Sequence, residues 1–265
     1  MKTVVAPDHK LKKRLSLQFK VVAALVIRNV MAKYGRGNLG FLWLIVEPIF
    51  LVGGVITMWT LLYRSGHGLP IAAFVFSGYM TLTLWRHLST AVGVMSGSYG
   101  LLYHRRITIF DIMIARALTE IAGVSAAGVV VYFLLLSIGV VDWLADPSLV
   151  LAGWLIMCLL GFGVSCITAG LSEKSEVLEN IIQPLQYLML PISGVFFMVA
   201  WVPKKFQEYI LINPLVHVYE MIRAGFFGQS VETHYSLSYP VIWSVFLNFI
   251  GILILNSSRK HLSAR

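Results

Sequence analysis

Long apolar stretches, separated by short polar ones, occupy most of this chain. A helix that crosses a membrane needs about 20 mostly apolar residues. Six stretches meet that length: residues 41–63, 71–92, 112–140, 149–171, 181–201 and 239–256. The pattern therefore predicts an all-α integral membrane protein with six transmembrane helices in a single domain over residues 1–265. An even number of crossings leaves both termini on the same side.

The segment over residues 15–35 is amphipathic rather than uniformly apolar. Its main apolar positions fall within about an 80° arc of a helix: Leu15, Phe19, Val22, Val26 and Val30. Its cations fall on the opposite side: Lys13, Lys20 and Arg28. We expect an interface helix with its cations toward lipid phosphates. The alternative is a short extra spanning helix, which Lys20 and Arg28 disfavour.

One connection, residues 202–238, is much longer than the others. It is rich in apolar and aromatic side chains, including Phe206, Tyr209, Phe226 and Phe227, which argues against a solvated loop. Non-helical backbone at membrane depth must be covered by protein or line a cavity. The segment therefore predicts re-entrant helices at the outer surface.

Composition supports a membrane protein, and the distribution of charge orients it. Hydrophobic residues make up 58% of the chain and charged residues 12%, with mean hydropathy +0.79, whereas soluble domains carry about 25% charged residues. The net charge of +9 does not require a nucleic-acid partner, because Lys and Arg gather on the cytoplasmic side of membrane spans. Most of these cations precede residue 41 or lie in the second and fourth connections and the tail. Both termini are therefore expected to be cytoplasmic.

Polar side chains form a stripe along the second predicted span. Tyr79, Thr83, Arg86 and Thr90 follow i, i+4, i+7, i+11 spacing, which is one face of a helix. A charged residue deep in the bilayer costs at least ~2.5 kcal/mol. The stripe should therefore face protein or water.

The first predicted span carries a comparable face, on which Glu47 precedes a proline that invites a kink. The two faces could line a route for a polar substrate, with aromatic rings stacking on sugars. The predicted path residues are Trp43, Glu47, Phe50, Tyr79, Thr83 and Arg86. Alternatively, Arg86 reaches the cytoplasmic edge of its span and Glu47 pairs with a cation inside the bundle.

Arg116 and Glu120 stand at i, i+4 near the start of the third predicted span. Side chains at this spacing are neighbours on a helix surface. We interpret the two residues as a structural ion pair.

The second cytoplasmic connection, residues 101–111, mixes apolar and basic side chains in a short segment. Such a segment suits a small helix that docks into a groove of a cytoplasmic partner. The residues expected to make that contact are Leu102, Tyr103, His104, Arg105, Arg106, Phe110 and Asp111. A solvated loop is the alternative.

Motifs for common chemistry are absent from the sequence. There is no G-x-x-x-x-G-K-[ST] phosphate loop, no H-E-x-x-H metal spacing and no G-x-S-x-G nucleophile elbow. Cys158 and Cys166 lie two helical turns apart, too distant to bridge, and are predicted to be buried thiols. We expect no cofactor, no metal and no catalytic residue in this chain.

The stretch 34–43, YGRGNLGFLW, with Glu47 and Pro48, resembles the start of the membrane subunits of ATP-binding-cassette polysaccharide exporters. The resemblance is greatest to capsular polysaccharide export permeases. Further similarity lies in stretches 105–116 and 213–223, and the resemblance covers essentially the whole chain. O-antigen and teichoic acid permeases share the pattern over residues 36–48 and remain an alternative.

The resemblance implies a homodimer in which each protomer docks one copy of a separate ATPase subunit. That subunit would bind ATP and Mg, and its closure would move a lipid-linked polysaccharide outward through a channel between the protomers. Segment 101–111 would be the coupling helix. The lipid head would enter at Arg28, Lys33 and Arg36. A bacterial inner-membrane location, a periplasmic co-polymerase and an outer-membrane channel are also implied.

A multipass membrane enzyme acting on lipid-linked sugars is the alternative from another class. It would need convergent acidic or histidine residues on an aqueous loop. The external segments offer acidic residues without an evident pair: Asp142, Asp146, Glu208, Glu220 and Glu232.

Overall fold

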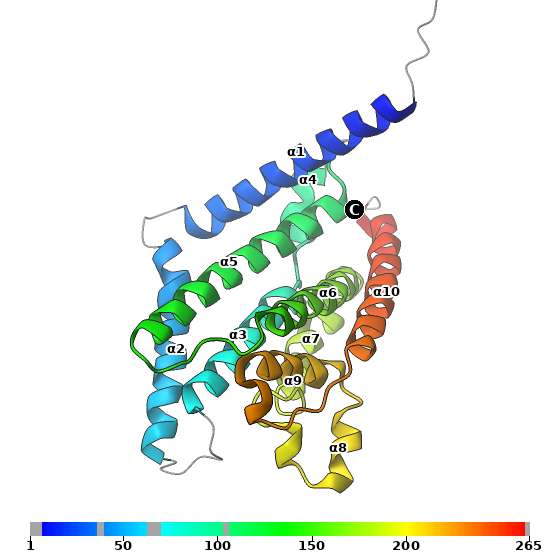
Figure 1. Ribbon diagram of the computed structural model, residues 1–265. Helices are drawn as coiled ribbons and strands as arrows, with labels where there is room; N and C mark the ends of the chain where they lie inside the picture. Colours follow the sequence, from blue (N-terminus) through cyan, green and yellow to red (C-terminus); the bar gives the residue numbers. More distant parts are fainter. Residues whose placement is uncertain (1–6, 36–39, 63–69, 103–105, 263–265) are drawn as a thin grey trace, which may run out of the picture.

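The computed structural model describes residues 7–35, 40–62, 70–102 and 106–262, and these form helices with no strand (Figure 1). The longer helices are α1 (Pro7–Tyr34), α2 (Gly40–Leu62), α3 (Ile71–Ser89), α5 (Ile109–Ser137), α6 (Pro147–Ser172), α7 (Glu176–Met189), α9 (Pro214–Phe227) and α10 (Ser238–Leu262). The short ones are η1 (Ser96–Ser98), α4 (Tyr99–Leu102), η2 (Val199–Trp201), α8 (Lys204–Ile210) and η3 (Gly228–Ser230). The predicted all-helical fold is confirmed for the described residues.

Five of the six predicted spans coincide with the helices α2, α3, α5, α6 and α10. Within the described residues, four helical stretches are long and apolar enough to cross a membrane: Leu15–Lys33, Ile109–Ser137, Pro147–Ser172 and Ser238–Ser258. The first belongs to the segment predicted as an interface helix, so its length and composition alone are also compatible with the spanning alternative.

The predicted fifth span, residues 181–201, is wrong as a single helix. Helix α7 ends at Met189 after 14 residues, about 21 Å at 1.5 Å per residue, short of the ~30 Å hydrocarbon core. Leu190 before Pro191 still has helical dihedral angles, but Gly194 adopts a φ of +90°, which an α-helix cannot contain. The chain then turns toward η2.

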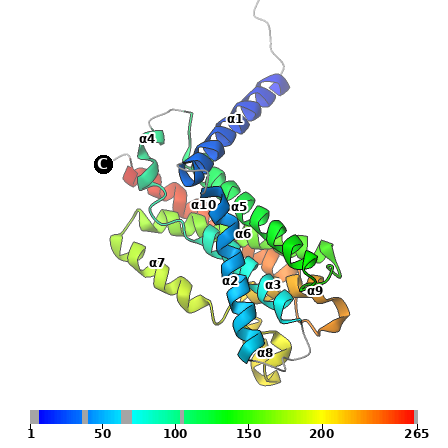
Figure 2. The ribbon, with the colours of Figure 1, turned by 90° about the vertical axis from the view of Figure 1, so that its left-hand side faces the viewer.

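The two ends of the helix bundle differ in what they carry. Figures 1 and 2 place the start of α1, the short helix α4 and the end of α10 at one end, and α8 at the opposite end. The beginning of α1 and the end of α10 therefore lie at the same end, as an even number of crossings predicts.

Helix α1 packs along α5 through a small apolar cluster. Leu25 is buried against Ile112 and Ala115, with Val22 and Val26 beside it. The predicted apolar arc is therefore only partly turned inward, and three of its members are exposed in the monomer: Leu15, Phe19 and Val30.

Helix α6 is the centre of the core and packs against α3, α9 and α10. Glycines let α6 and α10 approach closely, since a Cβ on Gly251 would lie 2.7 Å from the carbonyl oxygen of Gly163. Cys158 and Cys166 on α6 are free and buried, as predicted. At the start of α6, the Asp146 side chain accepts hydrogen bonds from Ser148, which hold the pKa of this carboxyl below its ordinary value.

Segment 202–238 is organised by α9, which is buried along most of its length. Arg223, only 1% exposed, donates to the carbonyls of Val195 and Phe197. Glu220 accepts from the backbone N–H groups of Val199 at 3.1 Å and His234 at 3.0 Å. These side chains tie α9 to the chain on both sides of it.

Candidate functional site

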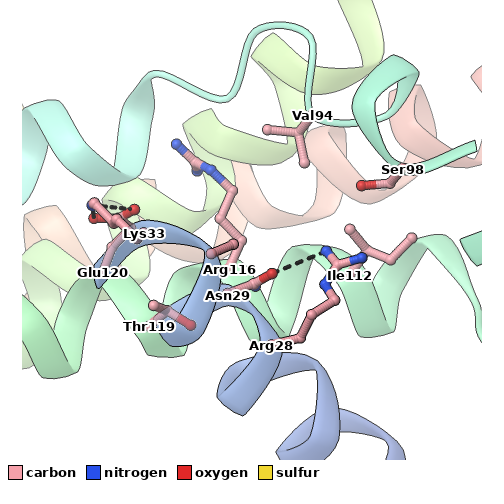
Figure 3. Close-up of a pocket in the computed structure, with 10 residues that line it drawn as sticks. Arg28, Asn29, Lys33, Val94, Ser98, Ile112, Arg116, Thr119 and Glu120 are labelled. Atoms are coloured by element: carbon pink, nitrogen blue, oxygen red, sulfur yellow. Dashed lines mark hydrogen bonds and ion pairs between the residues drawn. The ribbon is translucent and has the colours of Figure 1, made fainter. Parts of the chain in front are cut away.

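A cavity of about 320 Å³ opens between α1 and α5. In Figure 3, side chains of α1 (blue) lie against side chains of α5 (green), and Val94 and Ser98 close one side. The polar and charged lining residues are Arg28, Asn29, Lys33, Ser98, Arg116, Thr119 and Glu120. The cavity therefore contains two of the three residues expected at the lipid-head entrance.

A second cavity of about 270 Å³ adjoins the first, because Arg116 and Glu120 line both. The rest of its lining comes from the polar stripe of α3: Tyr79, Thr83, Arg86, His87 and Thr90. Three of the predicted path residues are thus brought together, and two α5 side chains connect them with the predicted entrance.

Glu120 joins three helices. Its carboxylate accepts from the Lys33 ammonium of α1 at 2.7 and 2.9 Å and from Nδ1 of His87 on α3 at 2.7 Å. An ionised carboxylate only accepts hydrogen bonds, so Nδ1 of His87 carries the hydrogen. The Glu120 side chain is 14% exposed and that of Lys33 is 37% exposed, which leaves this contact accessible from the cavity.

Arg116 holds the end of α3. Its guanidinium donates to the carbonyls of His87 at 3.0 Å, Leu88 at 3.2 Å and Thr90, and to the hydroxyl of Ser165 on α6 at 3.2 Å. A helix leaves its last carbonyls without intrahelical partners, and a cation there is favourable. Arg116 therefore fixes the point where α3 stops and the cavities begin.

Arg116 and Glu120 do not form the predicted direct ion pair, although their charges attract one another. Glu120 is bound by Lys33 and His87, whereas the hydrogen bonds of Arg116 go to the end of α3 and to α6. The i, i+4 spacing permits a pair, but orphan carbonyls at a helix end compete for the same guanidinium. Those carbonyls come from another helix, which the spacing could not reveal.

A smaller cavity of about 90 Å³ lies between α3 and α7. Arg86 and Thr90 line it from α3, and Gln183, Gln186 and Tyr187 line it from α7. The Thr90 hydroxyl donates to the Gln186 side chain at 3.1 Å. The glutamines were missed as site residues, although two amides in an otherwise apolar segment were a signal that could have found them.

The remaining predicted residues do not join this site in the described structure. Phe50 on α2 is 74% exposed and lines none of the three cavities. The side chains of Trp43 and Glu47, and Arg36 as a whole, lie outside what the structure describes. Their predicted roles remain predictions.

The described parts of the predicted coupling segment divide between two helices. Leu102 ends α4, and Phe110 and Asp111 belong to the first turn of α5. Asp111 is buried, forms a capping box with Thr108 and accepts from a side chain of α1. Arg106 is exposed, whereas three other members lie outside the described residues: Tyr103, His104 and Arg105. Asp111 therefore serves helix α5 here, and the coupling role of the segment stays a prediction.

The described lining of the two larger cavities carries an excess of positive charge. Four cations face the two larger cavities, Arg28, Lys33, Arg86 and Arg116, while Glu120 is the carboxylate in their described lining. An excess of positive charge in a hollow attracts anions.

Comparison with known proteins decides the family. The family model for the ABC-2 type transporter matches residues 20–227. The chain belongs to this family. Capsule polysaccharide export protein CtrC of Neisseria meningitidis serogroup B is 37% identical, with 93% of this chain and 94% of CtrC covered. BexB of Haemophilus influenzae, also a capsule polysaccharide export inner-membrane protein, is 34% identical with 94% and 95% covered. The polysialic acid transport protein KpsM of Escherichia coli is 28% identical with 90% and 93% covered.

Membership of the ABC-2 family explains the missing nucleotide motif. In this family the ATPase activity lies in a separate subunit, and this chain is a transmembrane permease subunit rather than an enzyme. It is a multi-pass inner-membrane protein. The expected resemblance to ATP-binding-cassette export permeases is confirmed at the level of the family.

Proposed function

We propose that this chain is the permease subunit of an ATP-driven exporter that moves lipid-linked capsular polysaccharide across the bacterial inner membrane. Similarity to capsule export proteins over more than nine-tenths of the chain supports the substrate class. The observation that carries the mechanism is that two predicted entrance residues and three predicted path residues line two adjoining cavities that share Arg116 and Glu120.

The polymer first contacts the cations of the entrance and then the hydroxyl and amide side chains of the path. Its anionic lipid head binds beside Arg28 and Lys33, where two cations meet it at the end of the bundle that holds α1. The first sugars pass Tyr79 and Thr83, and Gln186 offers further hydrogen bonds. Aromatic rings and amides suit a neutral or acidic sugar chain, because they bind its faces and hydroxyl groups without trapping it by charge.

The working assembly is a homodimer with two ATPase subunits, and its channel is completed between the protomers. In each protomer, α1 lies at the cytoplasmic leaflet and both termini are cytoplasmic. The six crossings are α2, α3, α5, α6, α10 and, as the fifth, α7 with the irregular chain that follows it. A periplasmic co-polymerase and an outer-membrane channel receive the polymer beyond the α8 end.

Complementation tests the function. A capsulated strain lacking its own permease is given this chain with its ATPase, and surface capsule is measured with a polymer-specific antibody. We expect export with the wild-type chain and at least a tenfold loss with Tyr79→Ala, while crosslinked dimers remain at wild-type level. Absence of export with a folded, membrane-inserted and ATPase-bound chain would refute the proposal.

A charge reversal tests the coupling segment separately. Arg106→Glu should leave membrane insertion intact but weaken copurification of the ATPase and remove stimulation of its ATP hydrolysis, because Arg106 is the exposed described cation of that segment. Lys204→Glu, an equal charge change on exposed α8 at the opposite end, is the control and should behave as wild type. Equal ATPase stimulation in both variants would sink the coupling role.

A further inference from the structure

One carboxylate, that of Glu120, lines the described part of the cavity between α1 and α5, and it binds side chains of two other helices. The cations Arg28, Lys33 and Arg116 line this cavity together with Glu120. Arg116 is committed to backbone carbonyls at the end of α3. Glu120 holds Lys33, so one of the cations that could receive an anion is already neutralised by the protein itself.

In the contact between Lys33 and Glu120, a ligand can replace Glu120 as the partner of Lys33. The contact joins the last turn of α1 to α5, and its lysine side chain is 37% exposed and lines the cavity. Ion pairs between exposed side chains contribute little to stability. Glu120 also keeps a second partner, His87 at 2.7 Å on α3, so the carboxylate stays bound when Lys33 leaves it.

We infer that Glu120 is an exchangeable counter-ion that holds Lys33 until a phosphate-bearing lipid head enters the cavity and takes its place. This inference rests on the proposed function and names a positioning residue for the entrance. Binding of the phosphate transfers Lys33 from the carboxylate to the ligand, while His87 retains Glu120. The last turn of α1 thereby loses its tie to α5 when the cavity is occupied.

The lining favours a lipid over a free phosphate ion. Besides its cations, the cavity is lined by the apolar side chains of Ala32, Val94 and Ile112, which suit the first methylene groups beside a headgroup. A soluble phosphate gains only the charge contacts there. Glu120 and the ligand compete for the Lys33 ammonium. Removal of the Glu120 charge should therefore tighten ligand binding, whereas a purely structural role of Glu120 predicts no tightening.

The test measures binding to the complete complex with its ATPase, in dodecyl maltoside micelles, which contain no phosphate, by calorimetry. The probes are dihexanoyl phosphatidic acid, inorganic phosphate and dihexanoylglycerol, which lacks the phosphate. Glu120→Gln should tighten phosphatidic acid binding by roughly threefold or more, in line with the modest strength of an ion pair whose lysine is partly exposed. Lys33→Gln should weaken it, and the double variant should bind no more tightly than Lys33→Gln.

Glu173→Gln is the matched control. It removes one carboxylate that accepts from Tyr99 at 2.8 Å and lines neither larger cavity, so it should leave affinity unchanged. Equal tightening in this control would reduce the effect to general charge and overturn the inference. Equal affinity for inorganic phosphate and phosphatidic acid would overturn the lipid assignment.

Two further results separate this inference from the proposed function. Weaker or unchanged phosphatidic acid binding by a Glu120→Gln variant with wild-type thermal stability overturns the exchange, even if the wild-type chain exports capsule. Tighter binding by that variant, in a chain that exports no capsule, retains the exchange and refutes the capsule assignment.

Discussion

Two helices of this protein each carry an arginine and a glutamate one turn apart, and the two sets are used in opposite ways. On α9, Glu220 and Arg223 are both 1% exposed, lie 4.0 Å apart and bind backbone groups. On α5, Arg116 and Glu120 line two cavities, and the Glu120 carboxylate contacts two side chains from other helices.

The difference lies in solvent access and in what each side chain holds. Arg223 and Glu220 satisfy carbonyls and N–H groups of an irregular chain that has no helix to pair them, and burial makes each of those bonds costly to lose. Around Glu120 the partners are the side chains of Lys33 and His87, and water or a ligand can replace Glu120 as the partner of Lys33. The same residue types therefore build a fixed support at the α8 end and an exchangeable site at the α1 end.

The largest effect should follow loss of the buried arginine. Arg223→Met leaves Glu220 and the carbonyls of Val195 and Phe197 without their cation, and removing one member of a buried charged set costs about 3–5 kcal/mol. We expect a similar loss in the free energy of unfolding, measured by titration with a denaturing detergent. Lys204→Met, which changes an exposed cation of the same segment, residues 202–238, is the control. Wild-type stability of Arg223→Met would contradict the support role of α9.

One substitution made in both regions compares them directly. Glu220→Gln keeps one acceptor but turns an amide donor toward a backbone N–H, so it should cost about 1–3 kcal/mol. Glu120→Gln should cost less than Glu220→Gln, because the Lys33 side chain with which Glu120 pairs is 37% exposed. Thermal unfolding of the two purified variants, measured side by side, checks the order. A larger loss for Glu120→Gln would reverse the comparison.

The lengths of the apolar stretches predicted most of the long helices, and each wrong prediction has an identifiable physical cause. Five helices coincide with predicted spans because their apolar runs approach or exceed the thickness of the bilayer core. The break after α7 was missed although Pro191 and Gly194 signal it. The partners of Arg116 could not be predicted, because its carbonyl acceptors lie 26 to 29 residues away and Ser165 lies 49 residues away. Only packing of α3, α5 and α6 brings them together.

The candidate site was predictable as a stripe but not as a cavity. Spacing placed Tyr79, Thr83 and Arg86 on one helix face, and all three line the second cavity. It could not show that Arg86 also lines a smaller cavity with Gln183 and Gln186, since which helix faces a stripe depends on tertiary packing.

Lys33→Met should cause the smallest loss of stability but a large loss of transport. Lys33→Met removes the ammonium from Glu120 but leaves that carboxylate its bond to His87, so the free energy of unfolding should fall by less than about 1 kcal/mol. Surface capsule in complemented cells should nevertheless fall at least tenfold, because a cation that meets the lipid head is gone. Lys20→Met, on exposed α1 and outside the described cavities, should retain export. If Lys33→Met exported normally, the α1 end would be a structural contact like α9, and the contrast between the two regions would disappear.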